Sequence, residues 1–115
     1  MGFDVLVFAE QREGRFKKSV FEMLRLARAL TAGDGVVGAV LCGAGVAPLA
    51  GQLSARGADR IWLADLPSLG LYNAAEYARV VEAAFNAGRP ALILFPATAM
   101  GRDLAPRFAA RIGVP

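Results

Sequence analysis

Four short apolar runs divide the chain and leave room for one helix after each of them. These runs span Phe3–Ala9, Val36–Cys42, Arg60–Ala64 and Ala91–Phe95. Three of them are almost continuously apolar, which is typical of strands buried on both faces of a parallel sheet. The pattern therefore predicts four parallel strands.

The segments after the first two runs have helical spacing and helix-boundary residues. The first predicted helix begins at Ser19, with Glu22 three residues later as in a capping box, and Gly33 provides its stop. The second has Pro48 in its first turn and Gly57 at its end. The apolar positions that recur every three or four residues in these helices are Val20, Met23, Leu24, Ala27, Leu30, Leu49, Ala50 and Leu53.

Two more helices follow the third and fourth runs. Asn73 precedes Glu76 by three residues, which predicts a capped start for the third helix. The fourth is predicted to start near Arg102 or Asp103, with Pro106 in its first turn, where a missing N–H costs little. The apolar positions of these two helices are Tyr77, Ala78, Val81, Ala84, Phe85, Leu104, Ala105, Phe108, Ala109 and Ile112.

Four consecutive strand–helix units predict an α/β fold, a three-layer α/β/α sandwich with an open parallel sheet. The 115 residues suffice for one domain. An apolar fraction of 56% is high for a soluble monomer. A four-stranded sheet would also leave an apolar edge, so we expect a further strand from elsewhere, or a longer protein of which this is a piece.

Composition excludes several classes of chemistry. The chain contains no histidine and one cysteine, Cys42, which rules out Ser-His and Cys-His catalysis and most zinc sites. Cys42 ends an apolar run, so we interpret it as a buried structural thiol in a reducing compartment. No apolar run approaches membrane-spanning length and no targeting segment is visible, which indicates a cytoplasmic or mature organellar protein without membrane insertion.

The net charge of +3 is spread over the predicted helices, so no nucleic-acid-binding stripe emerges. One local basic cluster, Arg12, Arg15, Lys17 and Lys18, follows the first strand, and we interpret it as a solvated loop.

Several polar and glycine positions fall at the predicted carboxyl edge of the sheet. Gly43-Ala44-Gly45 follows the second strand, but Pro48 occupies the place of a third glycine, so a tight turn is favoured over a dinucleotide fingerprint. Glu10 closes the first strand, and we favour a loop N–H or an arginine partner over a ligand. Asp65 closes the third strand and is interpreted as a turn former before Pro67.

The segment from Phe95 to Arg107 crosses from the last strand into the last helix and carries the most distinctive residues of the chain. Arg102 is expected to project from the loop, with a planar fork suited to a carboxylate, a phosphate or a main-chain carbonyl. Asp103, in the expected first turn, complements the helix dipole. We favour a role for Arg102 in tying its loop to a neighbouring loop or subunit.

With these residues in view, the chain resembles the N-terminal domain of the α subunit of electron transfer flavoprotein. The resemblance rests on Val5–Glu10, on Arg56–Asp65, on Tyr72–Tyr77, and on Thr98 with Gly101–Arg107, continued by Ala109–Gly113. It covers essentially the whole chain. The implied scaffold or interface residues, none of them catalytic, cofactor-binding or metal-binding, are Thr98, Gly101, Arg102, Asp103, Pro106 and Arg107.

The resemblance implies an electron carrier rather than an enzyme. Members of that family are αβ heterodimers that pass electrons from dehydrogenases, such as acyl-CoA dehydrogenases, through FAD to a quinone oxidoreductase. The FAD lies mainly in a C-terminal domain that this chain lacks, and the partner β subunit holds AMP. Residues 1–115 are thus expected to form a structural and subunit-docking domain that binds no cofactor itself.

Two other functions stay open at this stage. One is a stand-alone adenine-nucleotide-binding domain of the same fold, with its ligand near Gly43–Gly45 and Met100–Arg102, where strand order is expected to reverse. The other is an enzyme acting on a small acid through Arg102 and Asp103, which lacks a supporting base or metal site.

Overall fold

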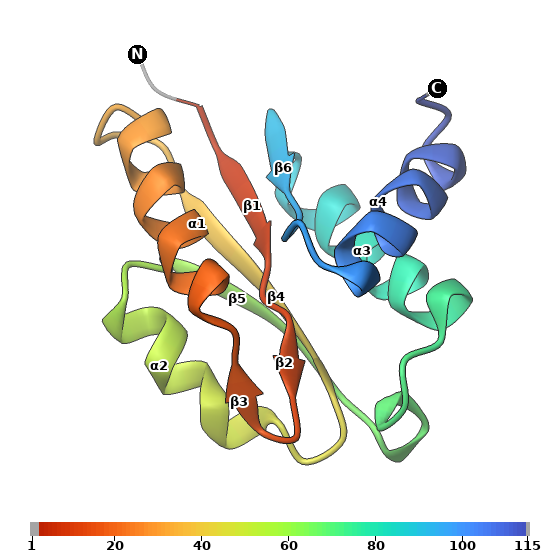
Figure 1. The fold of residues 1–115 in the computed structure, drawn as a ribbon. Coiled ribbons are helices and arrows are strands. Elements are labelled where there is room, and N and C mark those ends of the chain that lie inside the picture. The colour runs from red at the N-terminus through yellow and green to blue at the C-terminus, as the bar shows by residue number, and fades with distance from the viewer. Residues whose placement is uncertain (1–2, 115) are drawn as a thin grey trace.

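A four-stranded parallel sheet forms the centre of the computed structural model, which describes residues 3–114. Its strand order is β5-β4-β1-β6 (Figure 1). The strands are β1 (Val5–Phe8), β4 (Val37–Gly43), β5 (Arg60–Asp65) and β6 (Leu92–Leu94). The helices are α1 (Lys18–Leu30), α2 (Ala50–Ala55), α3 (Ala74–Gly88) and α4 (Ala99–Arg111).

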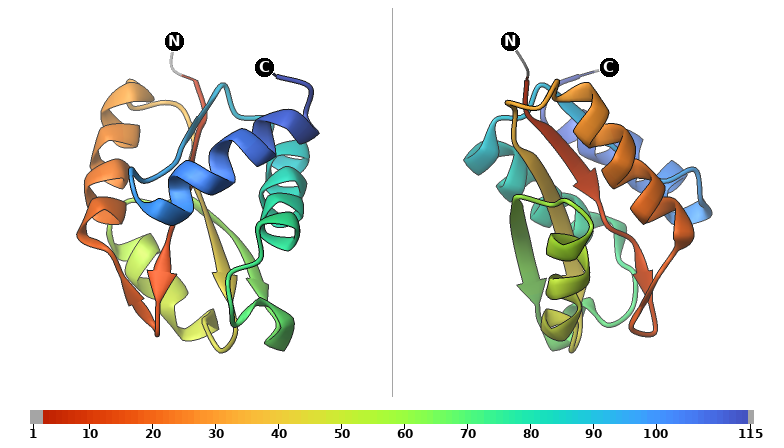
Figure 2. Two further views of the ribbon diagram at one scale, coloured as in Figure 1. Left: turned by 45° about the vertical axis from the view of Figure 1, so that its right-hand side comes forward. Right: turned by 90° about the vertical axis from the view of Figure 1, so that its left-hand side faces the viewer.

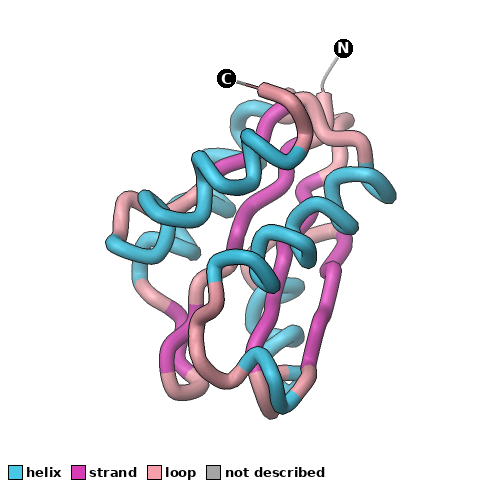
Figure 3. Tube along the Cα trace, turned by 90° about the vertical axis from the view of Figure 1, so that its right-hand side faces the viewer, coloured by secondary structure: helices cyan, strands magenta, loops and turns pink. Residues whose placement is uncertain are grey.

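Alternation along the central strands divides the core into two layers. Val5 and Val7 of β1 face α1 and α2, whereas Leu6 and Phe8 face α3 and α4. Figure 2 shows the helices on both sides of the sheet, and Figure 3 shows α3 and α4 lying in front of the strands. The expected three-layer α/β/α architecture is therefore confirmed.

Strand order reverses beside β1. Val5 pairs with Val37 of β4 on one side and with Leu92 of β6 on the other. The central strands β1 and β4 are fully buried, as their continuous apolar runs predict. The outer strands are only partly buried: Leu63 of β5 is 46% exposed and Leu92 of β6 is 36% exposed. Within residues 3–114 each of these two strands has one neighbour, so its continuous apolar sequence did not mean burial on both faces.

The basic cluster after β1 is not a simple loop. It forms a short antiparallel hairpin of β2 (Gln11–Arg12) and β3 (Arg15–Phe16). Glu13 and Gly14 at the turn have φ values of 54° and 79°, the left-handed geometry of a type I′ hairpin turn. Gly14 fits such a turn, but glutamate at position 13 is not a residue that favours positive φ, so the pair gave only a weak sequence signal.

Helix boundaries confirm part of the sequence-based expectation. Asn73 caps α3 by accepting a hydrogen bond of 3.0 Å from the Glu76 amide, as predicted. The predicted capping box at Ser19 is wrong, because α1 begins at Lys18 after an extended Lys17, and Ser19 lies inside the helix. The second predicted helix is a 3₁₀ turn, Ala47–Leu49, that contains Pro48 and continues into α2.

The start of α4 also differs from the prediction. Thr98 caps the helix, which places Arg102 and Asp103 beyond the first turn and Pro106 in the interior. Pro106 and Arg102 are both exposed, so the Arg102 carbonyl that loses its helical partner lies on the solvent side. Among residues 3–114, no helix has the length and apolar character needed to cross a membrane.

Candidate functional site at the carboxyl edge of the sheet

A buried carboxylate lies where strand order reverses. Glu10, directly after β1, is 1% exposed. The Thr98 hydroxyl, at the start of α4, donates to Glu10 Oε1 over 2.5 Å and accepts from the Gly101 amide over 3.1 Å. One hydroxyl thus links β1 to α4 and caps the helix at the same time. We expected an arginine or a loop N–H to bind Glu10, and within residues 3–114 that expectation is wrong. Because β1 and β6 are neighbours in the sheet, Thr98, which follows β6, lies beside Glu10 and donates the hydrogen bond instead.

Gly101 allows α4 to approach the preceding loop. A Cβ atom at this position would overlap the Pro96 carbonyl oxygen, a contact between backbone and side chain that cannot be accommodated without a shift. Gly101 is buried, and Leu104 behind it is 0% exposed. The glycine therefore fixes the distance between α4 and the end of β6.

Asp103 joins the start of α3 to α4. The Tyr72 hydroxyl donates to Asp103 Oδ2 over 2.7 Å, and Arg107 Nε donates to Oδ1 over 3.2 Å. The hydrogen bond from Tyr72 and then that from Arg107 hold the pKa of Asp103 below its usual range. Burial, together with the Asp103 carboxylate, raises the pKa of Tyr72. Asp103 acts here as an anchor between helices, and its expected place in the first helical turn is wrong.

Arg102 differs from Asp103 and Arg107 in making no such contact within the described part of the chain. It is exposed on the second turn of α4 and makes no side-chain hydrogen bond or ion pair with any residue between 3 and 114. The structure therefore separates the predicted residues into two groups. Thr98, Gly101, Asp103 and Arg107 hold the edge together, whereas Arg102 and Pro106 lie on its exposed side.

The second loop at this edge is closed by Asp65. Its carboxylate accepts from the Gly45 amide over 2.6 Å and from the Ala47 amide over 2.8 Å. Gly45 has a φ of 70°, which supports the tight-turn interpretation of Gly43-Ala44-Gly45. Asp65 holds that loop rather than forming a turn before Pro67, and two amides that could meet a phosphate are already occupied.

Cys42 lies beneath this edge. Its side chain is 3% exposed, and burial raises the pKa of the thiol to about 12. A thiol that is buried and protonated at neutral pH is a poor nucleophile. The interpretation of Cys42 as a structural residue is confirmed.

A groove of about 250 Å³ opens at the same edge. We call it the hairpin groove; it is lined by Gln11, Arg12, Glu13, Gly70, Leu71, Tyr72, Tyr77 and Met100. Sequence reasoning named Met100 and Tyr72 but missed the hairpin wall and Leu71. Gly14 at the turn was the one local signal for the wall, and the glutamate before it obscured that signal.

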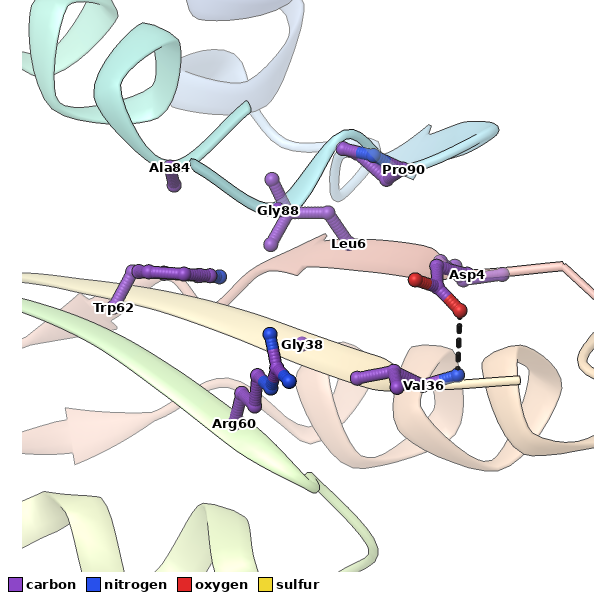
Figure 4. A pocket seen from close by; sticks show the side chains of 10 residues that line it. Asp4, Leu6, Val36, Gly38, Arg60, Trp62, Ala84, Gly88 and Pro90 are labelled. Atoms are coloured by element: carbon purple, nitrogen blue, oxygen red, sulfur yellow. Dashed lines mark hydrogen bonds between the residues drawn. The ribbon is translucent and has the colours of Figure 1, made fainter. Parts of the chain in front are cut away.

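A second cavity, at the amino edge, is much smaller. It holds about 20 Å³, roughly the room for one water molecule. Figure 4 shows Trp62, Arg60 and Asp4 around it, with the Asp4 carboxylate accepting from the Val36 amide over 2.8 Å. Added Cβ atoms at Gly38 and Gly88 would each lie 3.3 Å from the indole of Trp62. This cavity is a packing gap beside the tryptophan, and the carboxyl edge is the candidate site.

The strand order and the layers define a Rossmann-like α/β/α domain, with a carboxyl edge held by its own hydrogen bonds. Within residues 3–114 no group of three metal-binding side chains occurs. Comparison with known families is more specific. Residues 5–115 match the model of the electron transfer flavoprotein domain, and the chain belongs to this family.

Individual relatives agree with this assignment. The chain is 45% identical over 107 residues to the electron transfer flavoprotein subunit alpha of Megasphaera elsdenii, covering 91% of this chain and 31% of that protein. It is 38% identical over 112 residues to the subunit alpha of Bacillus subtilis, covering 97% of this chain and 34% of that protein. A protein named acryloyl-CoA reductase electron transfer subunit beta, from Anaerotignum propionicum, is 40% identical over 111 residues, covering 95% of this chain and 30% of that protein. The chain thus spans about a third of the length of these relatives.

Proposed function

We propose that this chain is the N-terminal platform domain of an α-type electron transfer flavoprotein subunit, and that it docks protein rather than cofactor. In this proposal the FAD is held mainly by a C-terminal domain that residues 1–115 do not include. The partner is a β-type subunit that carries AMP. The complex passes electrons from dehydrogenases to a quinone oxidoreductase, and this domain contributes structure to a carrier, not catalysis.

The internal pairing of polar groups at the carboxyl edge carries the proposal. Ligands of open parallel sheets bind at this edge, where strand order reverses. Here the Thr98 hydroxyl donates a hydrogen bond to Glu10, and the Asp65 carboxylate accepts from the Gly45 and Ala47 amides. The Asp103 carboxylate accepts from both Tyr72 and Arg107. A polar ligand would have to displace bonds that the domain already makes. This favours a scaffold over a ligand-binding site.

The first experiment measures the flavin content of the purified chain. We expect no flavin absorbance band, and no flavin fluorescence in the supernatant after heat denaturation. We also expect the tagged chain, coexpressed with the β-type subunit of the same organism, to copurify with it. A stoichiometric flavin spectrum from residues 1–115 alone, or failure to copurify, would contradict the proposal.

Adenine-nucleotide binding by this domain is tested by calorimetric titration with AMP. The exposed Arg102 is the side chain best placed for a phosphate, so Arg102→Ala is the test variant. Arg79→Ala, which changes an exposed arginine on α3, is the matched control. Micromolar affinity that Arg102→Ala abolishes and Arg79→Ala preserves would replace the platform proposal with a nucleotide-binding one.

A further inference from the structure

The hairpin groove has an apolar lip that is unusual for an exposed surface. Leu71 is 86% exposed, the highest value among the large apolar side chains of residues 3–114, and nearby Leu66 is 53% exposed. Leu71 lines the groove together with Tyr72 and Met100. Apolar side chains that line a concave surface, with polar residues around them, indicate a protein contact more often than an isolated exposed leucine does.

The polar side-chain groups of Gln11, Tyr72 and Tyr77 in the groove are already hydrogen-bonded inside the domain. The Tyr72 hydroxyl donates to Asp103, and the Tyr77 hydroxyl donates to the Leu69 carbonyl over 2.7 Å. The Gln11 side chain donates to the Cys42 carbonyl over 3.4 Å and accepts from the Gly14 amide over 3.0 Å. The charged groups left open in the groove are those of Arg12 and Glu13 on the hairpin wall, whereas Leu71 and Met100 offer apolar surface to a bound side chain.

The hairpin wall is fixed before any partner arrives. Gln11 ties the base of the hairpin to the end of β4, and a Cβ atom at Gly43 would lie 2.5 Å from Gln11 Nε2. Binding to a wall that is already ordered costs less conformational entropy than binding to a flexible loop. The short hairpin is thereby suited to be one rigid side of a docking site.

The charge around the groove comes from one wall. The segment 11–18 carries Arg12, Arg15, Lys17 and Lys18 against one anion, Glu13, whereas the opposite wall, residues 66–73, carries no charged residue. None of the four cations forms an ion pair with another residue between 3 and 114. Arg12 and Glu13 line the groove, and the other three cations follow on the same hairpin and the start of α1. The excess of positive charge on this wall favours an acidic partner by electrostatic complementarity.

We propose that the hairpin groove docks an acidic segment of a partner protein that inserts one phenylalanine- or leucine-sized side chain between Leu71 and the hairpin. The volume of about 250 Å³ is more than ten times that of the one-water cavity at the amino edge, enough for such a side chain. The inference rests on the proposed docking role for its biological setting. It adds where the contact lies and which chemistry it recognises.

Nuclear magnetic resonance titration tests the groove directly. The probe is a short synthetic peptide of aspartate and glutamate residues with one central phenylalanine, added to the nitrogen-15-labelled chain. We expect amide shifts confined to residues 11–13, 70–72 and 100, and an affinity that falls as salt is added. We expect Leu71→Ser to weaken the peptide affinity at least tenfold, and Leu26→Ser, a leucine 50% exposed on α1, to leave it unchanged.

Three results would overturn the inference: no shifts at millimolar peptide, shifts centred outside the groove, or equal affinity for peptides with lysines in place of the acids or serine in place of the phenylalanine. The copurification experiment separates this failure from that of the proposed function. A chain that copurifies with the β-type subunit but shows no peptide shifts overturns the groove inference alone. A chain that binds the peptide but does not copurify overturns the proposed function alone.

Discussion

The Thr98 hydroxyl donates a hydrogen bond of 2.5 Å to the carboxylate of Glu10, although 88 positions separate the two residues in the chain. The same hydroxyl accepts from the Gly101 amide at the start of α4. A single oxygen atom therefore serves both a buried carboxylate and a helix terminus, so its removal affects two elements together.

Thr98→Val should lower the free energy of unfolding by about 2–4 kcal/mol, because it removes a helix cap and leaves a buried carboxylate without its donor. Thr98→Ser keeps the hydroxyl and should lose less than about 1 kcal/mol. Urea denaturation followed by circular dichroism measures both variants. A loss in serine as large as that in valine would contradict the assignment of this stability to the hydroxyl, because serine keeps the hydroxyl and valine does not.

Gly101→Ala should destabilise the domain by more than about 2 kcal/mol, because the new Cβ overlaps the Pro96 carbonyl oxygen. Gly51, in the exposed part of α2, is the matched control, since a Cβ atom added there would have nothing within 4 Å. Gly51→Ala should stabilise the domain by roughly 0.5–1 kcal/mol through helix propensity. A thermal midpoint for Gly101→Ala at or above that of the native chain would contradict the proposed packing of α4.

Pro106→Ala should stabilise the isolated domain by about 1–3 kcal/mol. Pro106 lies inside α4, where proline removes a helical hydrogen bond and crowds the preceding turn. Its exposed position means that alanine loses little packing. Chemical denaturation measures the change; a loss of stability would indicate that α4 depends on a bend that proline provides.

The Tyr72–Asp103 pair should contribute to acid sensitivity. The pKa of Asp103 is lower in the folded state, so this residue stabilises the fold above the unfolded value of about 3.9, and the contribution is lost as the pH falls through the folded value. Tyr72→Phe removes the largest cause of the shift and should reduce the loss of stability between about pH 5 and pH 2. Urea melts across this range, compared with the native chain, test the effect; identical pH profiles would exclude a role for this pair.

Two capping patterns of identical spacing in the sequence had different outcomes in the structure. Asn73 with Glu76 and Ser19 with Glu22 have the same capping spacing, but only the first starts its helix there. The pairing of Phe16 with Gln11 carries the chain directly from β3 into α1, so the helix begins one residue before Ser19. The boundary thus lies directly after the local hairpin of residues 11–16, whereas the Ser-Glu spacing alone placed it too late.

In the candidate site, too, the sequence identified individual residues but not the contacts between distant segments. The carboxyl-edge run and its family resemblance pointed to Thr98, Gly101 and Asp103, and the structure places all three in close contacts. The Glu10–Thr98 bond required the order of β1 and β6, and the groove required the fold of the hairpin against residues 70–72. Neither relationship is encoded in a local pattern, because each joins segments that only the tertiary fold brings together.

The position of Trp62 makes it a reporter of folding. It is the single tryptophan of the chain, and its indole lies against Gly38 of the sheet and Gly88 of α3, at the end of the strands opposite the groove. Its emission therefore reports whether α3 remains seated on the sheet and is remote from any occupant of the other edge. The domain carries its own optical probe of folding, and this probe lies away from the docking site that we propose at the hairpin.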